Sequence, residues 1–324
     1  MELNHYLLKG RSSFEKLYTS ENDMGLCDLR ENLFQSEFIH DTMLFFETFK
    51  TKYELFEWMK SRNKGDSRIV EINEKEDDIV IIPTKDVNGK WAKQALKIFN
   101  GFHIIFVESG ESKYFNLSHS FNIGFKRALE YSPHWIIFSN DDMVLKDNPS
   151  VLKDSLQKAD NTAPALFCNP LIDGHSYQIE LGYESMLGKI RSFSQGRKLI
   201  FRELLERKFE AKIKMRNYVR ARGYHYFDPV MLVLLTGDFG ILNYSLVNSL
   251  KGNVFDETYI HGVEDIDLSI QLSILETPPD RIYYSIGSVG GGTRGKNMAR
   301  WLKDVANFSY LNHKLTSISR VNFR

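Results

Sequence analysis

Short apolar runs that alternate with helical stretches constrain the fold of this 324-residue chain more than any other feature. The runs are Ile79–Pro83, His103–Val107 and Trp135–Ser139, and helical patterns at Lys90–Phe99 and Phe121–Glu130 separate them. Continuous β-branched and aromatic runs of this length are typical of strands buried on both faces of a sheet. Their alternation with helices predicts an α/β fold with right-handed crossovers, whose ligands bind beyond the carboxyl ends of the strands.

The rest of the chain suggests how this domain is bounded. We expect further strands at Ala165–Cys168, Met231–Leu235 and Arg281–Ile286. Residues 1–75 and 297–324 show helical spacing of apolar positions. The pattern therefore predicts an N-terminal helical region at 1–75, an α/β domain at 76–296 with a basic helical insertion at about 186–223, and a helical tail at 297–324.

Composition restricts the class of protein. Hydrophobic residues make up 42% and charged residues 26%, which is typical of a globular chain. The 42 basic and 42 acidic residues balance, so nucleic acid is not an expected partner of the whole chain. Two cysteines, Cys27 and Cys168, favour a reducing compartment. With no basic, apolar leader and no long apolar span, we expect a cytoplasmic protein.

A first acidic station, Asn140-Asp141-Asp142, follows the third apolar run. Carboxylate and amide oxygens are hard ligands that suit Mg²⁺ or Mn²⁺, which keep water and substrate phosphate as further ligands. The alternative is an Asn/Asp turn after a strand, which propensity alone favours.

A second acidic station, Glu264-Asp265, follows the Gly262 turn and leads into an amphipathic stretch. Acidic residues commonly occupy the first turn of a helix, because they complement its dipole. The functional alternative is a general base that deprotonates an acceptor hydroxyl as it attacks. His261, three residues before Glu264, is a candidate acceptor-side or metal contact.

From Asp78 to about Gly295, the chain resembles a family 2 glycosyltransferase with the GT-A fold. The resemblance depends on an ordered set of short motifs rather than on any single one. These motifs are Ile81-Ile82-Pro83-Thr84, Asn122-Ile123-Gly124, Asn140-Asp141-Asp142, Thr236-Gly237, Phe255-Asp256-Glu257 and Glu264-Asp265 followed by Leu268.

The resemblance implies a GT-A fold, a Rossmann-like mixed sheet flanked by helices, and metal-assisted, inverting sugar transfer. The donor would be a nucleotide-sugar, the cofactor Mn²⁺ or Mg²⁺, and the acceptor a hydroxyl of a glycan or of a lipid-linked molecule. Asp265 would be the base with Glu264 beside it, Asp142 the metal ligand with Asn140, and Gly237, Asp238 and His261 would border the acceptor. The donor would contact Pro83, Thr84, Glu108, Asn122, Asp141 and Arg294.

Three positions depart from the family pattern. Asn140 stands where many members have an aspartate, and Glu108 replaces the usual aspartate after the second strand. Many members also carry a metal-binding histidine near the last strand, whereas this chain has Ser285-Ile286-Gly287-Ser288 there.

A strongly basic span covers residues 189–222, with twelve Lys or Arg and three Glu. It suits a solvated helical face, a helix on an anionic membrane surface, or a contact with an acidic polymer. The membrane alternative would make this cytoplasmic protein peripherally membrane-associated.

The Gly-rich segment Gly290–Asn297 differs by one residue from a phosphate-binding P-loop, because Asn297 replaces Ser or Thr. We expect a loop in which Arg294 or Lys296 closes over the donor diphosphate; a plain connector is the alternative. Two other functions stay open: a non-catalytic module that docks on a membrane or acidic polymer, and a nucleotidyltransferase.

Overall fold

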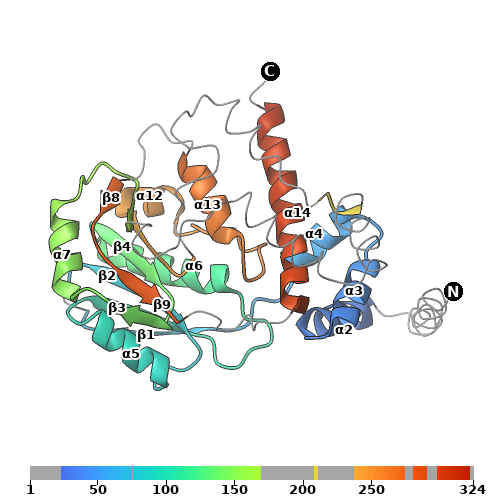
Figure 1. Cartoon of the computed structure of the whole chain (residues 1–324), viewed down its shortest axis with the longest axis horizontal. Coiled ribbons are helices and arrows are strands. Elements are labelled where there is room, and N and C mark those ends of the chain that lie inside the picture. Colours follow the sequence, from blue (N-terminus) through green and yellow to red (C-terminus); the bar gives the residue numbers. More distant parts are fainter. Residues whose placement is uncertain are drawn as a thin grey trace.

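The computed structural model describes residues 23–74, 76–168, 208–210, 237–273, 280–289 and 298–321. Its centre is a seven-stranded sheet in the order β1-β3-β2-β4-β7-β6-β8 (Figure 1). The strands are β1 (Arg68–Ile72), β2 (Ile79–Thr84), β3 (His103–Glu108), β4 (Trp135–Ser139), β6 (Ala165–Cys168), β7 (Phe239–Asn243) and β8 (Asp280–Ile282). β2 runs parallel to β3 and β4, whereas β1 and β7 run antiparallel to their neighbours. The expected α/β fold with a mixed sheet is confirmed.

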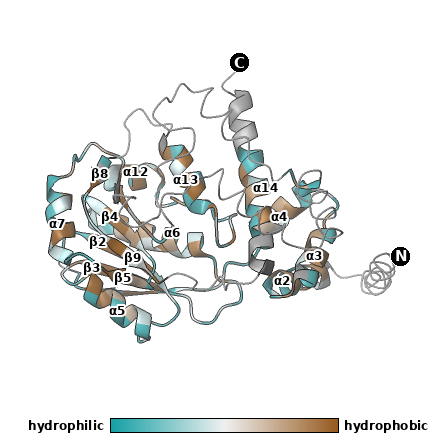
Figure 2. Cartoon of the chain, viewed as in Figure 1, coloured by the Kyte–Doolittle hydropathy of each residue, from teal (hydrophilic) through white to brown (hydrophobic). Residues whose placement is uncertain are grey.

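Helices cover both faces of the sheet. On one face, Val80 and Ile82 pack with apolar residues of α5 (Lys90–Ile98) and α7 (Pro149–Lys158). On the other face, Ile79 and Ile81 share a core with α6 (Leu117–Ala128), α12 (Tyr244–Ser249) and α13 (Glu264–Ser273). Figure 2 shows the hydrophobic residues along these central strands. Burial on both faces explains why the β2 sequence is apolar without alternation.

A second group of helices lies beside the sheet (Figure 1). It consists of α2 (Asp23–Gln35), α3 (Ile39–Glu47), α4 (Lys52–Ser61) and the long α14 (Met298–Val321). Their core includes Phe45, Trp58 and Leu311, all buried. We call these helices and this core the helical side.

Helix α13 belongs to both cores. Leu268 and Leu272 pack into the core between the sheet and α6, whereas Ile266 and Ile270 pack into the core of the helical side. Because the two apolar faces bury different partners, the position of the first turn of α13 depends on both halves of the molecule.

Two elements differ from the expectations. Helices α2, α3 and α4 agree with a mainly helical region 1–75, but its last part contains an unexpected strand, β1, which pairs with the edge of β3. The segment expected as one strand at Arg281–Ile286 forms two, since β8 joins the main sheet and β9 (Ile286–Ser288) pairs with β5 (Met143–Leu145) in a separate ribbon.

Several expectations lie outside the described residues. They concern the strand at Met231–Leu235, the basic span apart from 208–210, and the Gly-rich loop with Arg294. Among the helices that the structure describes, none has the length and apolar character needed to cross a membrane.

Candidate active site at the strand ends

The carboxyl ends of β2 and β4 bring two predicted site residues into contact. The Thr84 hydroxyl donates a hydrogen bond to Asp141 Oδ2 at 2.7 Å. Pairing between β2 and β4 ends at Ile81, so Pro83, which lacks an N–H, lies beyond the β4 ladder. Helix α6 can approach β2 closely because Gly124 has no side chain: a Cβ there would collide with Ile81.

Asp141 and Asp142 form a half-buried acidic pair. Burial raises the pKa of Asp141, the Thr84 hydrogen bond opposes this effect, and the neighbouring Asp142 adds to it. Burial also raises the pKa of Asp142, and the carboxylate of Asp238 raises it further. Like charges held together in a partly dry site favour protonation or a bound cation.

The segment Gly237–Asp238 links the two acidic stations. The Asn140 N–H donates to the Asp238 carbonyl at 2.9 Å, and the Gly237 N–H donates to Asp265 Oδ2 at 3.0 Å. A Cβ at Gly237 would lie 3.3 Å from that carboxylate oxygen, so glycine permits the close approach. Asn140, Gly237–Asp238 and Asp265, which are far apart in the sequence, thus lie close together beyond the carboxyl end of β4.

The backbone before α13 is strained. His261, Gly262 and Val263 have φ angles of 54°, 154° and 75°. A positive φ is unusual for a β-branched residue such as Val263, and strained residues of this kind cluster at functional sites. The helix then starts normally, because the Asp267 N–H donates to the Val263 carbonyl at 2.9 Å.

The strained segment delivers two acidic side chains into a largely buried position. Glu264 is 3% exposed and Asp265 is 9% exposed. Asp265 Oδ1 accepts the Ile266 N–H at 2.8 Å, while Oδ2 accepts the Gly237 N–H. The carboxylate of Asp265 is therefore oriented by two backbone donors.

Three buried asparagines hold the backbone that leads into this segment. Asn122 bonds the Phe255 N–H and carbonyl at 3.0 and 2.8 Å, and Asn307 of α14 does the same for Ile260 at 3.0 and 2.9 Å. Asn116 donates to the Tyr259 carbonyl at 3.1 Å. Asn122 was expected to bind the donor, but its side chain is only 1% exposed. It is one of the three asparagines that hold this backbone, and it does not join the side chains at the strand ends.

Glu108 ends β3 beside Thr84, with which it is in register. Its carboxylate accepts the Val87 N–H at 3.1 Å and pairs with Arg68 of β1. The hydrogen bond from Arg68 lowers the pKa of Glu108. Both oxygens are thus engaged, and a nucleotide contact would have to share them.

The side chains around Asp142 include the kind of ligand that Mg²⁺ and Mn²⁺ take in proteins. Mg²⁺ and Mn²⁺ are commonly held by one or two carboxylates with water and phosphate oxygens as further ligands. Asp142 and Asp238 supply such carboxylates, and the carboxylate of Asp238 raises the pKa of Asp142. Within the described residues, no three His, Cys, Asp or Glu side chains are grouped so that they could hold a metal by themselves.

Strand β9 runs past the same position. The Val289 N–H donates to the Asp142 carbonyl at 3.0 Å, and Ser288 is in register with Met143. The segment where the family resemblance expects a metal-binding histidine therefore lies against Asp142, but it carries Ser288 and Val289.

Sequence reasoning missed Lys314 of α14, which contacts Asp267 in the first turn of α13. Its ammonium donates to Asp267 at 2.6 Å and to Asp256 at 3.0 Å. Burial would lower the pKa of Lys314, but the two carboxylates outweigh burial and raise it. No local pattern pairs a lysine with partners 47 and 58 residues away, so the sequence offers no signal for this contact.

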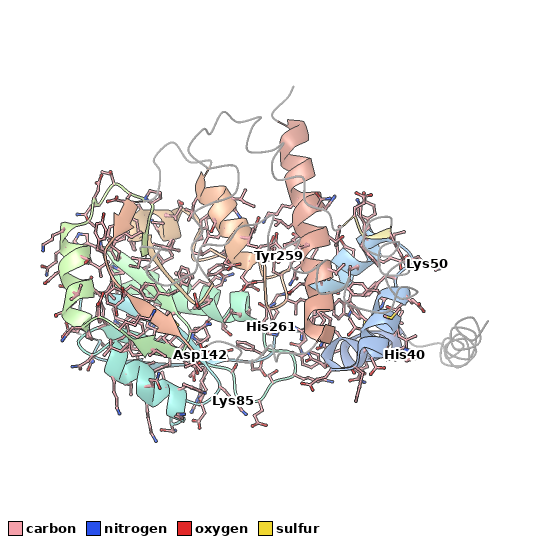
Figure 3. All side chains as sticks on the ribbon, in the orientation of Figure 1. His40, Lys50, Lys85, Asp142, Tyr259 and His261 are labelled. Carbon is pink, nitrogen blue, oxygen red and sulfur yellow. The ribbon has the colours of Figure 1, made fainter. Side chains whose placement is uncertain are left out.

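Figure 3 shows Asp142 near the strand ends and His261 between the sheet and α14. The chain matches no protein-family model, and no curated protein matches it in sequence. Any functional conclusion therefore depends on the geometry of the site.

Proposed function

We propose that this protein is an inverting glycosyltransferase that moves a sugar from a nucleotide-sugar donor to a hydroxyl of a glycan or lipid-linked acceptor. One observation carries the proposal: Gly237–Asp238 contacts both Asn140, at the acidic strand end, and Asp265, at the start of α13. A cation-favouring carboxylate pair and an oriented carboxylate base at one sheet edge suit displacement of a diphosphate.

The reaction that these residues support is a single displacement. Asp265 accepts the proton of the acceptor hydroxyl while that oxygen forms a bond to the anomeric carbon of the donor. The bond between the anomeric carbon and the diphosphate oxygen breaks, and the nucleoside diphosphate leaves with the bonding electrons. Attack opposite the leaving group inverts the anomeric configuration.

The two sides of the site divide this task. Asp142 and Asp238 would hold Mn²⁺ or Mg²⁺, which neutralises charge on the leaving diphosphate. Thr84 and Asp141 lie next to Asp142 on the donor side and are already oriented by their mutual hydrogen bond. Asp265 remains on the acceptor side, where burial restricts access of water.

A panel of nucleotide-sugars with Mn²⁺ or Mg²⁺ tests the proposal, with release of nucleoside diphosphate as the measurement. We expect Asp265→Asn to lower the rate by about 10²- to 10⁴-fold, because it removes a general base. Asp154→Asn is the matched control, since Asp154 is exposed on α7, away from the strand-end site.

Two outcomes would contradict the proposal. Release of pyrophosphate would indicate a nucleotidyltransferase instead. If no donor binds with either cation, the fold serves a non-catalytic role.

A further inference from the structure

Phe115 and His261 form an aromatic pair on the acceptor side of the candidate site. Their ring centroids are 5.3 Å apart and their planes are inclined by 24°, so the rings are stacked. Both side chains are partly exposed. Phe115 lies in the loop between β3 and α6, just before the Asn116 N-cap, and His261 begins the strained segment before Glu264.

A buried charge fixes the loop that carries Phe115. The Arg62 guanidinium donates to the carbonyls of Lys113, Tyr114 and Phe115 at 3.0, 3.4 and 3.5 Å. Glu31 of α2 holds that guanidinium through two hydrogen bonds of 2.7 and 2.8 Å. Both side chains are at least 96% buried, so this anchor is part of the interior rather than a surface ion pair.

The backbone of His261 is also fixed. Asn307 bonds both the N–H and the carbonyl of the preceding Ile260, and His261 itself has a φ of 54°. The backbone that carries the Phe115 ring and the His261 ring is therefore held in place before a ligand binds. A surface ordered in advance loses little conformational entropy on binding.

We propose that Phe115 and His261 form the acceptor subsite and that it takes an uncharged sugar ring. This inference rests on the proposed function and deepens it by naming the class of acceptor. An aromatic face carries negative charge density, which attracts the positively polarised C–H bonds on one face of a pyranose. His261 lies four residues before Asp265, so in the chain the proposed subsite adjoins the proposed base.

The charges around the pair favour a neutral ligand over a nucleotide. Glu264 and Asp265 follow His261 by three and four residues, and Glu257, which pairs with His119 and Lys64, lies four residues before it. These carboxylates repel phosphate groups, whereas sugar hydroxyls can donate hydrogen bonds to them.

The inference also assigns a task to the helical side. Glu31 in α2 and Arg62 just after α4 hold the loop of Phe115, and Asn307 in α14 holds the backbone next to His261. The N-terminal helices thus contribute to the acceptor subsite by positioning it, without touching the ligand.

Saturation-transfer NMR of the full chain with methyl glycosides of glucose, galactose, mannose and N-acetylglucosamine tests the subsite. The samples contain neither metal nor nucleotide, so sugar binding is measured apart from transfer. We expect at least one glycoside to bind, and its affinity to fall about tenfold in Phe115→Leu, which keeps apolar volume but removes the ring. The exposed Tyr53→Leu is the aromatic control and should leave the affinity unchanged.

His261→Asn provides an independent variant, because asparagine tolerates a positive φ and lacks the aromatic ring. This variant should weaken binding of the same glycoside. If Phe115→Leu does not fold, His261→Asn alone tests whether the aromatic pair binds sugar. The subsite is refuted if no glycoside binds, if both ring variants bind as well as the wild type, or if free nucleosides compete for the same rings.

The same samples separate this inference from the proposed function. Asp142→Asn should keep glycoside binding while it loses Mn²⁺-dependent binding of nucleoside diphosphates. Glycoside binding through Phe115 without any donor binding would uphold the subsite and reject the transferase. Sugar transfer with an unchanged acceptor KM in Phe115→Leu would uphold the transferase and reject the subsite.

Discussion

The strand-end cluster and the helical side treat buried charge in opposite ways. On the helical side, Glu31 of α2 pairs with Arg62, and Lys314 of α14 pairs with Asp267 of the neighbouring α13. Burial raises the pKa values of Asp267, Asp141 and Asp142 alike; Lys314 opposes this at Asp267, whereas no lysine or arginine of the described residues opposes it at Asp141 and Asp142. This contrast in pairing supports our proposal that the strand-end carboxylates bind a metal cation.

The largest expected effect on stability is at the Glu31–Arg62 pair. Arg62→Met leaves Glu31 buried without its partner, which should lower the free energy of unfolding by about 3–5 kcal/mol. Urea denaturation measures this change. Lys60→Met is the control, because Lys60 and Glu57 form an exposed pair whose loss should change stability by less than about 1 kcal/mol. Equal effects of the two variants would remove the contrast between this pair and a surface contact.

A smaller effect is expected at Lys314. Lys314→Met leaves Asp267, whose side chain is 3% exposed, without its ammonium partner, so unfolding should become easier by roughly 2 kcal/mol. The same variant should loosen the first turns of α13, which hydrogen exchange of their amides can detect. Lys314→Arg keeps the charge and should retain most of the stability. Unchanged exchange in Lys314→Met would show that α14 does not support α13 through this contact.

The pH dependence of stability offers a third test, at Glu71 of β1, which lies beside the amino end of β3. Burial would raise the pKa of Glu71, but hydrogen bonds from Tyr131, Arg127 and His103 outweigh burial and lower it. Because the unfolded state then binds the proton more tightly, the stabilisation is present above the ordinary glutamate pKa of about 4.3 and is lost as pH falls through the lower folded value. Glu71→Gln should therefore destabilise at neutral pH and match the wild type in acid. A difference that grows in acid would mean that the sign is wrong.

Much of the sheet could be predicted from local sequence, because β2, β3 and β4 are buried on both faces and read as unbroken apolar runs. Strand β1 was missed, since its short edge sequence Arg68–Ile72 follows a helical region and pairs on one side only. The start of α13 at Glu264 was expected from its acidic first turn.

Only some residues of the candidate site could be predicted from the sequence. Thr84, Asp141, Asp142 and Asp265 were named from motifs, and the structure brings Thr84 to Asp141 and Gly237 to Asp265. The roles of Arg62 and Lys314 could not be predicted, because each depends on partners that only the folded chain brings near. The burial of Asn122 was hidden for the same reason.

The variant with the smallest expected change in stability, Asp142→Asn, tests the central claim most directly. Its thermal unfolding is compared with that of the wild type, with and without Mn²⁺ plus UDP, GDP, ADP or CDP. Without ligand, the variant should be as stable as the wild type or more stable by up to about 1 kcal/mol, because it removes a half-buried like charge that solvent partly screens. Mn²⁺ with one of the nucleotides should raise the melting temperature of the wild type but not of the variant. A variant clearly less stable than the wild type, or an equal shift in both proteins, would contradict a cation-dependent nucleotide site at the strand ends.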